Sequence, residues 1–253
     1  MRNMFSLSGK TILVTGSCGL VGKEICKALP EFGANVIATD VDDAKGKELE
    51  ETVKGVRYSH LDITAPEQVK SAMSSMDQID GVVNTAYPRN KNYGNNFEQV
   101  AYKDWVENVT MHLGGYYLVC REAILNMLDA NTIGSVVNFG SIYGIQAPDF
   151  RVYEGLDMTS PIEYSAIKAG VINFTRYIAS YFGGDGIRAN VISPGGIYNG
   201  QPSSFVEEYE SRVPLDRMAE TEDIIGTVVY LLSEASSYVT GENIVVDGGW
   251  TIK

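Results

Sequence analysis

The stretch Thr11–Gly22, which reads TILVTGSCGLVG, decides the fold predicted for this chain. Its first five residues are apolar or β-branched, which is typical of a strand covered on both faces of a sheet. The run then breaks into a turn with three glycines, Gly16, Gly19 and Gly22, and a helical apolar pattern follows. Such a turn lets backbone N–H groups approach a pyrophosphate, and the positive helix end favours the phosphate charge. We expect a dinucleotide site here; a glycine-rich turn without a ligand is the alternative.

Support for a dinucleotide comes from the acid that ends the next apolar run. Residues 35–39 (NVIAT) read as a second strand, and Asp40 follows them. A carboxylate at this place can accept hydrogen bonds from the ribose hydroxyls of NAD, and it repels the 2′-phosphate of NADP. Asp42 and Asp43 add negative charge and no arginine adjoins Asp40, so we expect NAD. The alternative is that Asp40 only caps the helix that begins near Asp42 or Asp43.

Apolar runs and helical patterns alternate along the rest of the chain. Further strands are predicted at residues 55–59, 80–84, 135–139, 186–193 and 243–246, and helices at 66–76, 102–130 and 221–233. This rhythm implies right-handed crossovers and a parallel sheet. We therefore predict an α/β fold, a doubly wound Rossmann fold with a seven-stranded parallel sheet and helices on both faces. Residues 1–253 are expected to form one domain, because no repeat or linker interrupts them.

A Tyr-x-x-x-Lys pair in the second half of the chain has the chemistry of an acid–base catalyst. Tyr164 and Lys168 lie one turn apart on a predicted helix and so share a face. A nearby ammonium favours a phenolate, so we expect Lys168 to lower the pKa of Tyr164 from its usual value of about 10. A phenol tuned in this way exchanges a proton with an alcohol or a carbonyl oxygen. Ser141, after a predicted strand, can donate a hydrogen bond to the same oxygen. The alternatives are a half-buried tyrosine beside a solvated lysine, and a serine that caps a turn.

Composition limits the classes of partner. The formal net charge of −12 argues against a nucleic-acid surface and against an anionic membrane. Cys18, Cys26 and Cys120 have no metal-ligand spacing, so we expect no metal site and reduced thiols, consistent with a cytoplasmic protein. Residues 1–9 lack the apolar core of a signal peptide, and no apolar run approaches the length of a membrane span.

Taken together, the motifs resemble those of the short-chain dehydrogenase/reductase family over nearly the whole chain. The residues that carry the resemblance are TGSCGLVG at 15–22, Asp40, Asp62, Asn84, Ser141, Tyr164 with Lys168, Pro194 with Gly195, and VDGG at 246–249. The glycine spacing is similar to that of the larger sugar-nucleotide epimerases and dehydratases, since Leu20 stands where single-domain members usually have glycine. Those larger members carry a substrate domain for which this chain is too short.

The resemblance implies that Ser141, Tyr164 and Lys168 are catalytic and that Lys168 also binds the nicotinamide ribose. The residues expected to contact the cofactor are Gly16, Ser17, Cys18, Gly19, Leu20, Val21, Asp40, Asp62, Ile63, Asn84, Ala86, Tyr164, Lys168, Pro194, Gly195 and Ile197. Asp62 either accepts a hydrogen bond from the adenine amino group or caps the helix that follows it. The resemblance also implies a homo-oligomer, a tetramer or a dimer, with the tail around Trp250 at subunit contacts.

One position departs from the family pattern. Residues 112–117 are similar to a family segment that normally begins with an asparagine, which holds a helix bulge and a water next to the lysine. Here His112 occupies that position, and Asn108 lies one turn earlier. Either His112 supports a modified proton relay as a fourth catalytic residue, or the function of the asparagine falls to Asn108. A packed, non-catalytic histidine is the plainer alternative.

Three loops, at residues 86–100, 144–160 and 198–213, are expected to bind the substrate at one edge of the sheet. The segment between Ser141 and Tyr164 is longer than is usual for single-domain members of the family. The candidate substrate-binding residues in the loops are Arg89, Lys91, Arg151 and Tyr153. The cationic side chains suggest a polar, anionic substrate such as a sugar phosphate or a nucleotide sugar. Residues 200–212 are expected to form a mobile lid. Plain solvent-facing loops are the alternative.

The sequence thus predicts an NAD(H)-dependent oxidoreductase that interconverts a secondary alcohol and a ketone. Its expected substrate is a small carbohydrate-type molecule, in the synthesis of surface-glycan precursors. Two other interpretations stay open. A sugar epimerase or dehydratase would hold NAD tightly, as the glycine spacing suggests, and a catalytically weak NAD-binding sensor or scaffold would explain His112.

Overall fold

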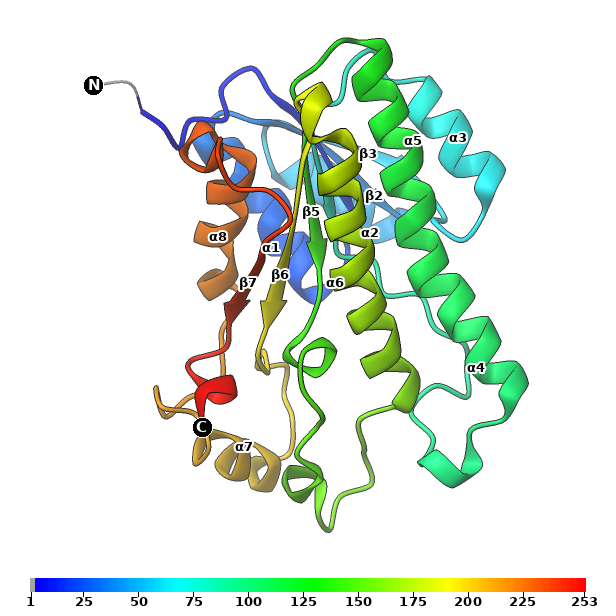
Figure 1. The fold of residues 1–253 in the computed structure, drawn as a ribbon, viewed down its shortest axis with the longest axis vertical. Helices are drawn as coiled ribbons and strands as arrows, with labels where there is room; N and C mark the ends of the chain where they lie inside the picture. The colour runs from blue at the N-terminus through cyan, green and yellow to red at the C-terminus, as the bar shows by residue number, and fades with distance from the viewer. Residues whose placement is uncertain (1–2) are drawn as a thin grey trace.

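Figure 1 shows the computed structural model, which describes residues 3–253. Parallel strands form one sheet in the order β3-β2-β1-β4-β5-β6-β7. The strands are β1 (Thr11–Thr15), β2 (Asn35–Asp40), β3 (Val56–His60), β4 (Gly81–Asn84), β5 (Ser135–Phe139), β6 (Arg188–Pro194) and β7 (Asn243–Val246). The predicted doubly wound α/β fold is confirmed. Because β4 returns to pair with β1, the strand order reverses between these two strands, where ligands bind in such folds.

Helices cover both faces of the sheet (Figure 1). One face carries α1 (Leu20–Ala28), α2 (Asp43–Thr52) and α8 (Glu222–Leu232). The other carries α3 (Pro66–Ser74), α4 (Tyr102–Val109), α5 (Gly115–Asp129) and α6 (Ile162–Phe182). The short helix α7 (Ser203–Glu210) lies beyond the carboxyl ends of β5 and β6. Within residues 3–253, no helix combines the length and the apolar character that a bilayer span requires.

The central strand β1 shows why its sequence is apolar throughout rather than alternating. Ile12 and Val14 belong to the core beneath α1 and α8, while Leu13 belongs to the core beneath α5 and α6. Successive side chains of a strand point to opposite faces, and here both faces are covered. All three side chains are therefore fully buried.

Several predicted element boundaries were wrong by a residue or two. The structure has β3 at Val56–His60, β4 at Gly81–Asn84, β6 at Arg188–Pro194, α3 at Pro66–Ser74 and α8 at Glu222–Leu232. The start of β6 has a clear cause. Gly186 adopts a left-handed conformation with φ of 80°, so it belongs to the turn after α6. Pairing with β5 begins only where Arg188 faces Ser135.

The helix predicted at residues 102–130 is interrupted. α4 ends at Val109, a π-helical turn occupies Thr110–Gly114, and α5 begins at Gly115. A π-turn places one extra residue in the helical path, often at a functional site, and hydrophobic periodicity does not reveal it. The turn brings His112 into the interior, where its side chain is fully buried.

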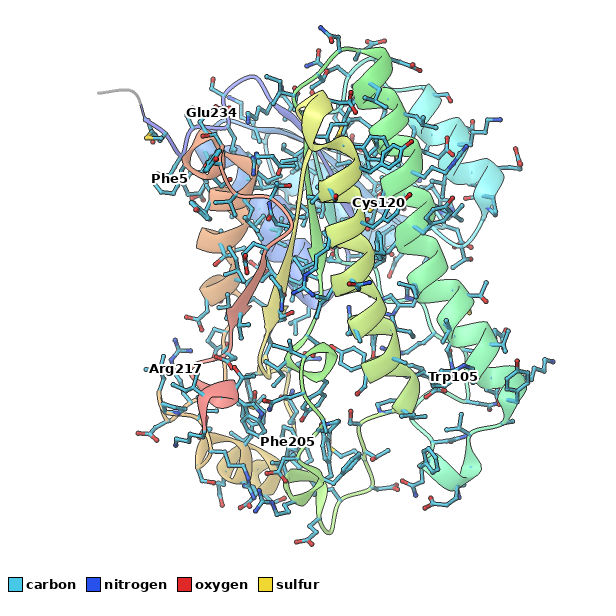
Figure 2. All side chains as sticks on the ribbon, in the orientation of Figure 1. Phe5, Trp105, Cys120, Phe205, Arg217 and Glu234 are labelled. Carbon is cyan, nitrogen blue, oxygen red and sulfur yellow. The ribbon has the colours of Figure 1, made fainter. Side chains whose placement is uncertain are left out.

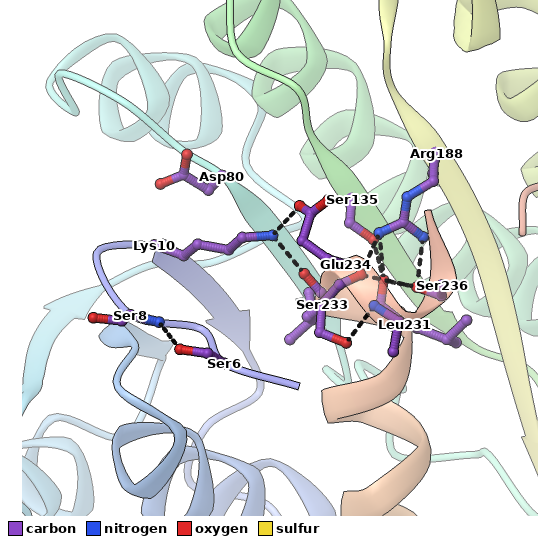
Figure 3. A network of polar contacts seen from close by, with 12 residues as sticks. Ser6, Ser8, Lys10, Asp80, Ser135, Arg188, Leu231, Ser233, Glu234 and Ser236 are labelled. Carbon is purple, nitrogen blue, oxygen red and sulfur yellow. Dashed lines mark hydrogen bonds and ion pairs between the residues drawn. The ribbon is translucent and has the colours of Figure 1, made fainter. Parts of the chain in front are cut away.

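At the end of the sheet where the strands begin, two cationic side chains donate hydrogen bonds to the last turn of α8 and the segment after it (Figure 3). Arg188 donates hydrogen bonds to the Leu231 carbonyl at 2.8 Å and to the Ser236 hydroxyl at 2.9 Å. Lys10 donates to the Leu232 carbonyl at 2.9 Å. These carbonyls end α8, where cationic donors are favoured. The network ties α8 to β1 and β6, and the opposite end of the sheet is left for the candidate site.

Candidate active site

A cavity of about 980 Å³ lies at the carboxyl ends of the strands. This volume is at the upper end of the range for small-molecule and cofactor sites. Its wall runs from the glycine turn after β1, across the ends of β2, β4 and β5, to the turn after β6. The sequence-predicted residues that line it are Gly16, Cys18, Gly19, Leu20, Val21, Asp40, Asp62, Ile63, Ala86, Arg89, Ser141, Tyr153, Tyr164, Lys168, Pro194, Gly195 and Ile197.

The glycine turn brings the start of α1 against the cavity. At Gly16 the chain passes so close to the loop after β4 that a Cβ would lie 2.5 Å from the Ala86 backbone. No side chain caps α1, and its first turn holds no acidic residue. The free N–H groups of that turn and the positive helix end therefore face the cavity without a protein anion, an arrangement that fits a phosphate.

Asp40 is held as a fixed acceptor at the end of β2. One carboxylate oxygen accepts from the Cys18 N–H at 2.9 Å, and the other accepts from the N–H groups of Val41 at 2.8 Å and Asp42 at 3.1 Å. The helix cap is a different residue, because Asp42 accepts from the Lys45 N–H. The alternative that Asp40 only caps α2 is therefore wrong, and its carboxylate lies in the cavity wall.

Two expected cofactor residues do not reach the cavity. Ser17 is fully buried and its N–H donates to the Thr39 carbonyl at 3.1 Å. Asn84 is also fully buried, and its amide donates to Asn138 Oδ1 at 2.8 Å. Both residues serve the framework of the sheet. Asp62 does line the cavity, and its carboxylate accepts from the N–H of Thr64 at 2.8 Å, which fixes the turn before α3.

Ser141, Tyr164 and Lys168 meet at the other end of the cavity. Ser141 follows β5 and is buried, with its hydroxyl accepting from the Tyr143 N–H at 3.1 Å. Tyr164 lies in the first turn of α6 and is partly exposed to the cavity. Lys168, one turn later, is buried, and its Nζ donates to the Phe139 carbonyl at 2.7 Å and lies 5.6 Å from the Tyr164 ring centre. Two elements thus bring a hydroxyl, a phenol and an amine to one place.

The prediction that Lys168 lowers the pKa of Tyr164 was wrong for the protein by itself. Burial raises the pKa of the Tyr164 phenol, and the nearby Ser141 side chain opposes only part of that rise. Burial also lowers the pKa of Lys168, to about 7. Removing both groups from water disfavours both charged forms, and this outweighs the attraction on which the sequence argument relied. The phenol is therefore protonated at neutral pH.

Comparison with known proteins decides the family. A family model described as enoyl-(acyl carrier protein) reductase matches residues 19–251. Dehydrogenase/reductase SDR family member 6 of Rattus norvegicus is 30% identical over 98% of this chain and 100% of its own length. The chain is a short-chain dehydrogenase/reductase. It is accordingly an oxidoreductase of a family that acts on CH–OH groups, and the predicted family and enzyme class are confirmed.

Two further relatives are similar to this short-chain dehydrogenase/reductase over nearly its full length. Post-translational flagellin modification protein A of Campylobacter coli is 35% identical over 96% of this chain and 99% of its own. The crystal structure of a short-chain dehydrogenase from Leptospira borgpetersenii with bound NAD+ superposes with a TM-score of 0.87. It shares 32% identity and covers 99% of this chain and 96% of its own.

In this dehydrogenase/reductase His112, not Asn108, lies beside Lys168. His112 Nε2 lies 3.4 Å from Lys168 Nζ, and the imidazole packs edge-on against the rings of Tyr87 and Tyr116, both at 5.1 Å. Burial, and then the nearby Lys168, hold the pKa of His112 well below its usual value, so the ring is neutral. Asn108 instead accepts from the Asn90 N–H at 2.9 Å and donates to Glu163 at 3.2 Å.

Sequence reasoning placed the substrate loops of the dehydrogenase/reductase but named few of the individual side chains that line the cavity there. The additional lining residues are Tyr87, Pro88, Tyr143, Met158, Gln201, Phe205, Tyr209 and Met218. Tyr87 directly follows the predicted cofactor segment and Tyr143 follows Ser141, so adjacency to the motifs was a usable signal. Met158, Phe205 and Tyr209 reach the cavity only because α7 packs against the loop before α6, which is residues 144–160.

Two of the four predicted substrate residues do not reach the cavity. Arg89 and Tyr153 line it, while Lys91 and Arg151 do not. Arg151 is mostly exposed and pairs with Asp149, to which its guanidinium donates at 2.6 and 2.8 Å. Lys91 is exposed on the same loop as Arg89. Of the arginines in residues 3–253, Arg89 is thus the one that lines the substrate side of the cavity.

The predicted lid at residues 200–212 contains the packed helix α7. Phe205 and Tyr209 are buried in a small core with Val152, Val213 and Trp250. Figure 2 shows Phe205 at the end of the molecule where α7 meets the loop before α6. Tyr209 stacks on Trp250 with ring centres 4.3 Å apart, so the tail contacts its own chain.

The loop before α6 starts from a close approach to that helix. A Cβ at Gly144 would lie 2.7 Å from the carbonyl carbon of Lys168, a contact that side chains do not tolerate. Further on, Asp149 accepts from Arg212, just after α7, at 3.0 Å. The loop and α7 thus form one wall of the cavity.

Proposed function

We propose that this short-chain dehydrogenase/reductase interconverts a secondary alcohol and a ketone with NAD(H). The observation that carries the proposal is the convergence of Ser141, Tyr164 and Lys168 at one end of a cavity whose other end holds the glycine turn and Asp40. A bound nicotinamide supplies or accepts the hydride. Everything else in the proposed reaction is assigned to side chains of this chain.

Tyr164 is the proton donor and acceptor in the proposal. In the reductive direction its protonated phenol gives the hydroxyl proton to the ketone oxygen, on which negative charge develops. Ser141 donates a hydrogen bond to the same oxygen and stabilises that charge. Lys168 lies close behind the phenol and binds the ribose, and the neutral His112 positions Lys168 through Nε2.

NAD rather than NADP is the proposed cofactor. The fixed carboxylate of Asp40 offers acceptors to the ribose hydroxyls at the adenosine end, and it repels a 2′-phosphate. Leu20, Val21, Asp62, Ile63 and Ala86 lie along the same part of the wall. The Leptospira relative, a similar chain crystallised with NAD+, supports this assignment.

The proposed substrate is a small polar molecule of the carbohydrate type. The hydroxyls of several tyrosines and the amides of Asn199 and Gln201 offer hydrogen bonds in the substrate part of the cavity, and aromatic rings offer faces on which a sugar can pack. The similarity to flagellin modification protein A of Campylobacter coli supports a role in the synthesis of surface-glycan precursors.

We also propose a cytoplasmic homo-oligomer. Tyr177 and Tyr181 on α6 are 67% and 65% exposed and stack on each other, and Tyr117 on α5 is 54% exposed. Exposed aromatic side chains on neighbouring helices suit contact with a second copy of the chain.

Replacement of Tyr164 by phenylalanine tests the proposal. We expect kcat/KM for the oxidoreduction to fall by about 100- to 10,000-fold, because the proton donor is lost. NAD binding should persist, which isothermal titration calorimetry would check. Tyr153→Phe removes a phenol from the same cavity and should reduce the rate far less.

Two outcomes would reject the proposed oxidoreduction. Unchanged activity in Tyr164→Phe would mean that the phenol transfers no proton, as in an NAD-binding sensor. Conversion of a sugar without net change in absorbance at the reduced-nicotinamide band would indicate an epimerase or dehydratase that holds its NAD.

A further inference from the structure

The charged residues of the cavity wall are divided between its two ends. The carboxylates in the wall are those of Asp40, Asp42 and Asp62, all at the adenosine end. Lys45 lies there too and pairs with Asp42 at 2.9 Å. Within the described residues, the substrate end of the wall has no carboxylate, and it presents the guanidinium of Arg89. The chain has a net charge of −12, and Lys45 at the other end of the wall has a carboxylate partner. Arg89 differs from Lys45 because no carboxylate lines its end of the wall.

Arg89 is not engaged in an ion pair. Its guanidinium carbon lies 4.9 Å from the centre of the Tyr87 ring, and no carboxylate of residues 3–253 lies within ion-pair distance of it. Arg151, Arg212 and Arg217, by contrast, each pair with an aspartate. No ion pair within residues 3–253 therefore competes with an anion that reaches Arg89 from the cavity.

The backbone next to Arg89 is held in place by α4. The Asn90 N–H donates to Asn108 at 2.9 Å, and the Asn90 amide donates to Asp104 at 2.9 Å and to Glu107 at 2.8 Å. Asp104 and Glu107 thus accept hydrogen bonds from the Asn90 amide, and neither forms an ion pair with Arg89. The anchor orders the loop in advance, which lowers the entropy cost of binding a ligand through it.

The ring of Tyr87 connects Arg89 to the reacting phenol. Its centre lies 5.8 Å from the centre of the Tyr164 ring, edge to face, and 4.9 Å from the Arg89 guanidinium carbon. A molecule whose carbinol oxygen contacts Tyr164 would pass along Tyr87 before its far end meets Arg89. The path from the Tyr164 ring past the Tyr87 ring to the Arg89 guanidinium, in steps of 5.8 and 4.9 Å, suits the length of a small sugar chain or ring.

We propose that Arg89 binds an anionic group, a phosphate monoester or a carboxylate, at the end of a polyhydroxylated substrate remote from the carbon that exchanges hydride. The inference rests on the proposed function, because it takes Tyr164 as the reacting end. Two parallel N–H···O bonds from a guanidinium match either anion, whereas a neutral hydroxyl leaves the charge uncompensated. Lys91 and Arg151, outside the cavity, take no part.

The test compares matched probes at saturating NAD+. D-glucitol, D-glucitol 6-phosphate and L-gulonate share a polyol chain and differ only at C6 of the glucitol chain, so they separate the neutral, phosphate and carboxylate forms. In the unaltered protein we expect kcat/KM for at least one anionic probe to exceed that for D-glucitol. In Arg89→Gln that advantage should fall by about 10- to 100-fold, chiefly through KM. Arg89→Lys should restore part of it.

Lys91→Gln is the matched control, since it removes one positive charge from the same loop outside the cavity. It should leave the ratio of anionic to neutral probes within about twofold, because general electrostatic attraction is weak between solvated charges. An equal loss in Lys91→Gln and Arg89→Gln, or no anionic advantage in the unaltered protein, would overturn the proposal.

Binding without turnover separates this proposal from the proposed function. Inorganic phosphate and malonate should raise the midpoint of thermal unfolding of the NAD+-saturated protein, and Arg89→Gln should abolish the shift. If this shift is found but no probe is oxidised, the anion site stands and the proposed reaction fails. If probes are oxidised but neither anion binds through Arg89, the reaction stands and the anion site fails.

Discussion

Burial disfavours the charged form of Lys168, the form on which its expected effect on the Tyr164 phenol depends. Its ammonium is held by one carbonyl and faces the uncharged His112, Tyr116 and Tyr164. Among residues 3–253 no carboxylate pairs with it to offset the loss of water, and burial lowers the pKa of Lys168 to about 7. The sequence placed Tyr164 and Lys168 on one face, as found, but it carried no information on how much water surrounds them.

The lowered pKa of Lys168 predicts a rise in stability with pH. The unfolded chain keeps this proton up to the usual lysine pKa of about 10.4, whereas the folded protein releases it near pH 7. The unfolded state therefore binds more protons above pH 7, and the cost of burying the charge, complete below pH 7, declines as the pH rises. The free energy of urea unfolding, measured from about pH 6 to 9, should increase relative to that of Lys168→Met.

A control for the pH experiment is Lys70→Met, which removes an exposed lysine of α3. This variant should keep the pH dependence of the unaltered protein. Parallel curves for the unaltered protein and Lys168→Met would show that the lysine remains charged through this range.

Asp40 decides the cofactor in our proposal, and its replacement by serine should weaken that choice. The serine keeps a polar group but removes the charge that repels a 2′-phosphate. We expect the ratio of kcat/KM with NAD to that with NADP to fall by about tenfold or more, which is about 1.4 kcal/mol. Steady-state rates with both cofactors measure the ratio.

Asp43→Ser is the matched variant for Asp40. Its carboxylate accepts from Tyr58 and contacts His60, and it does not line the cavity. The ratio should stay unchanged in this variant. A preference of the unaltered protein for NADP would contradict the assignment of Asp40.

At the scale of elements, the loop before α6 and the helix α7 act as one wall. Asp149 accepts from both Arg151 and Arg212, and these cations hold the pKa of its carboxyl below its usual range. Only the contact with Arg212 crosses between the two elements. It joins the small apolar core of Val152, Phe205 and Tyr209 in fixing the wall.

Asp149→Asn should loosen that wall without unfolding the protein. The pair is partly solvated, so we expect a change in unfolding free energy of less than about 1 kcal/mol. KM for the substrate should rise several-fold while kcat changes less, because the wall positions substrate but carries no reacting group. Glu208→Gln, which removes a contact of Arg212 within the α7 segment, should have a smaller effect on KM. Equal effects of the two variants would argue against a tie between elements.

Elements were predictable where one pattern persisted over many residues. The strands and the helices that cover them follow from continuous apolar runs between glycine turns, because burial on both faces imposes that composition. The helix α7 was not predicted, and the π-turn at Thr110–Gly114 was implied only by the resemblance, which places a helix bulge at His112. One inserted residue leaves no periodic signal, and α7 is stabilised by Trp250 and Val152, which lie far from it in sequence.

For the molecule as a whole, the exposed aromatics of α5 and α6 are the basis of a prediction about assembly. Introducing glutamate at both Tyr177 and Tyr181 should shift the protein toward monomers, because two like charges would meet across a pairing of these helices. Sedimentation velocity would measure the shift. Ile133→Glu, at an exposed site outside these helices, should leave the assembly unchanged. A monomeric unaltered protein would contradict the proposed oligomer.

The site residues that could be predicted from sequence and those that could not lie at different ends of the cavity. The cofactor end is made of local motifs, so Gly16, Asp40 and the residues near them were found from sequence. The substrate end is assembled from loops distant in sequence. Arg89 could be told from Lys91 and Arg151 only once the cavity was visible, since all three are cations in polar loops.

Gly144 separates the catalytic residues from the loop before α6, and this limits how the substrate range of the enzyme can be engineered. Because no side chain fits between it and the backbone of Lys168, randomising this position would displace the amine and abolish turnover before selectivity could be judged. After Gly144, the loop packs through aromatic side chains, with Tyr153 against Phe150 and Phe205. Libraries for directed evolution should therefore hold Gly144, Asp149 and Val152 constant and diversify the other positions from Gln146 to Ser160, where new specificities can arise on an intact catalytic frame.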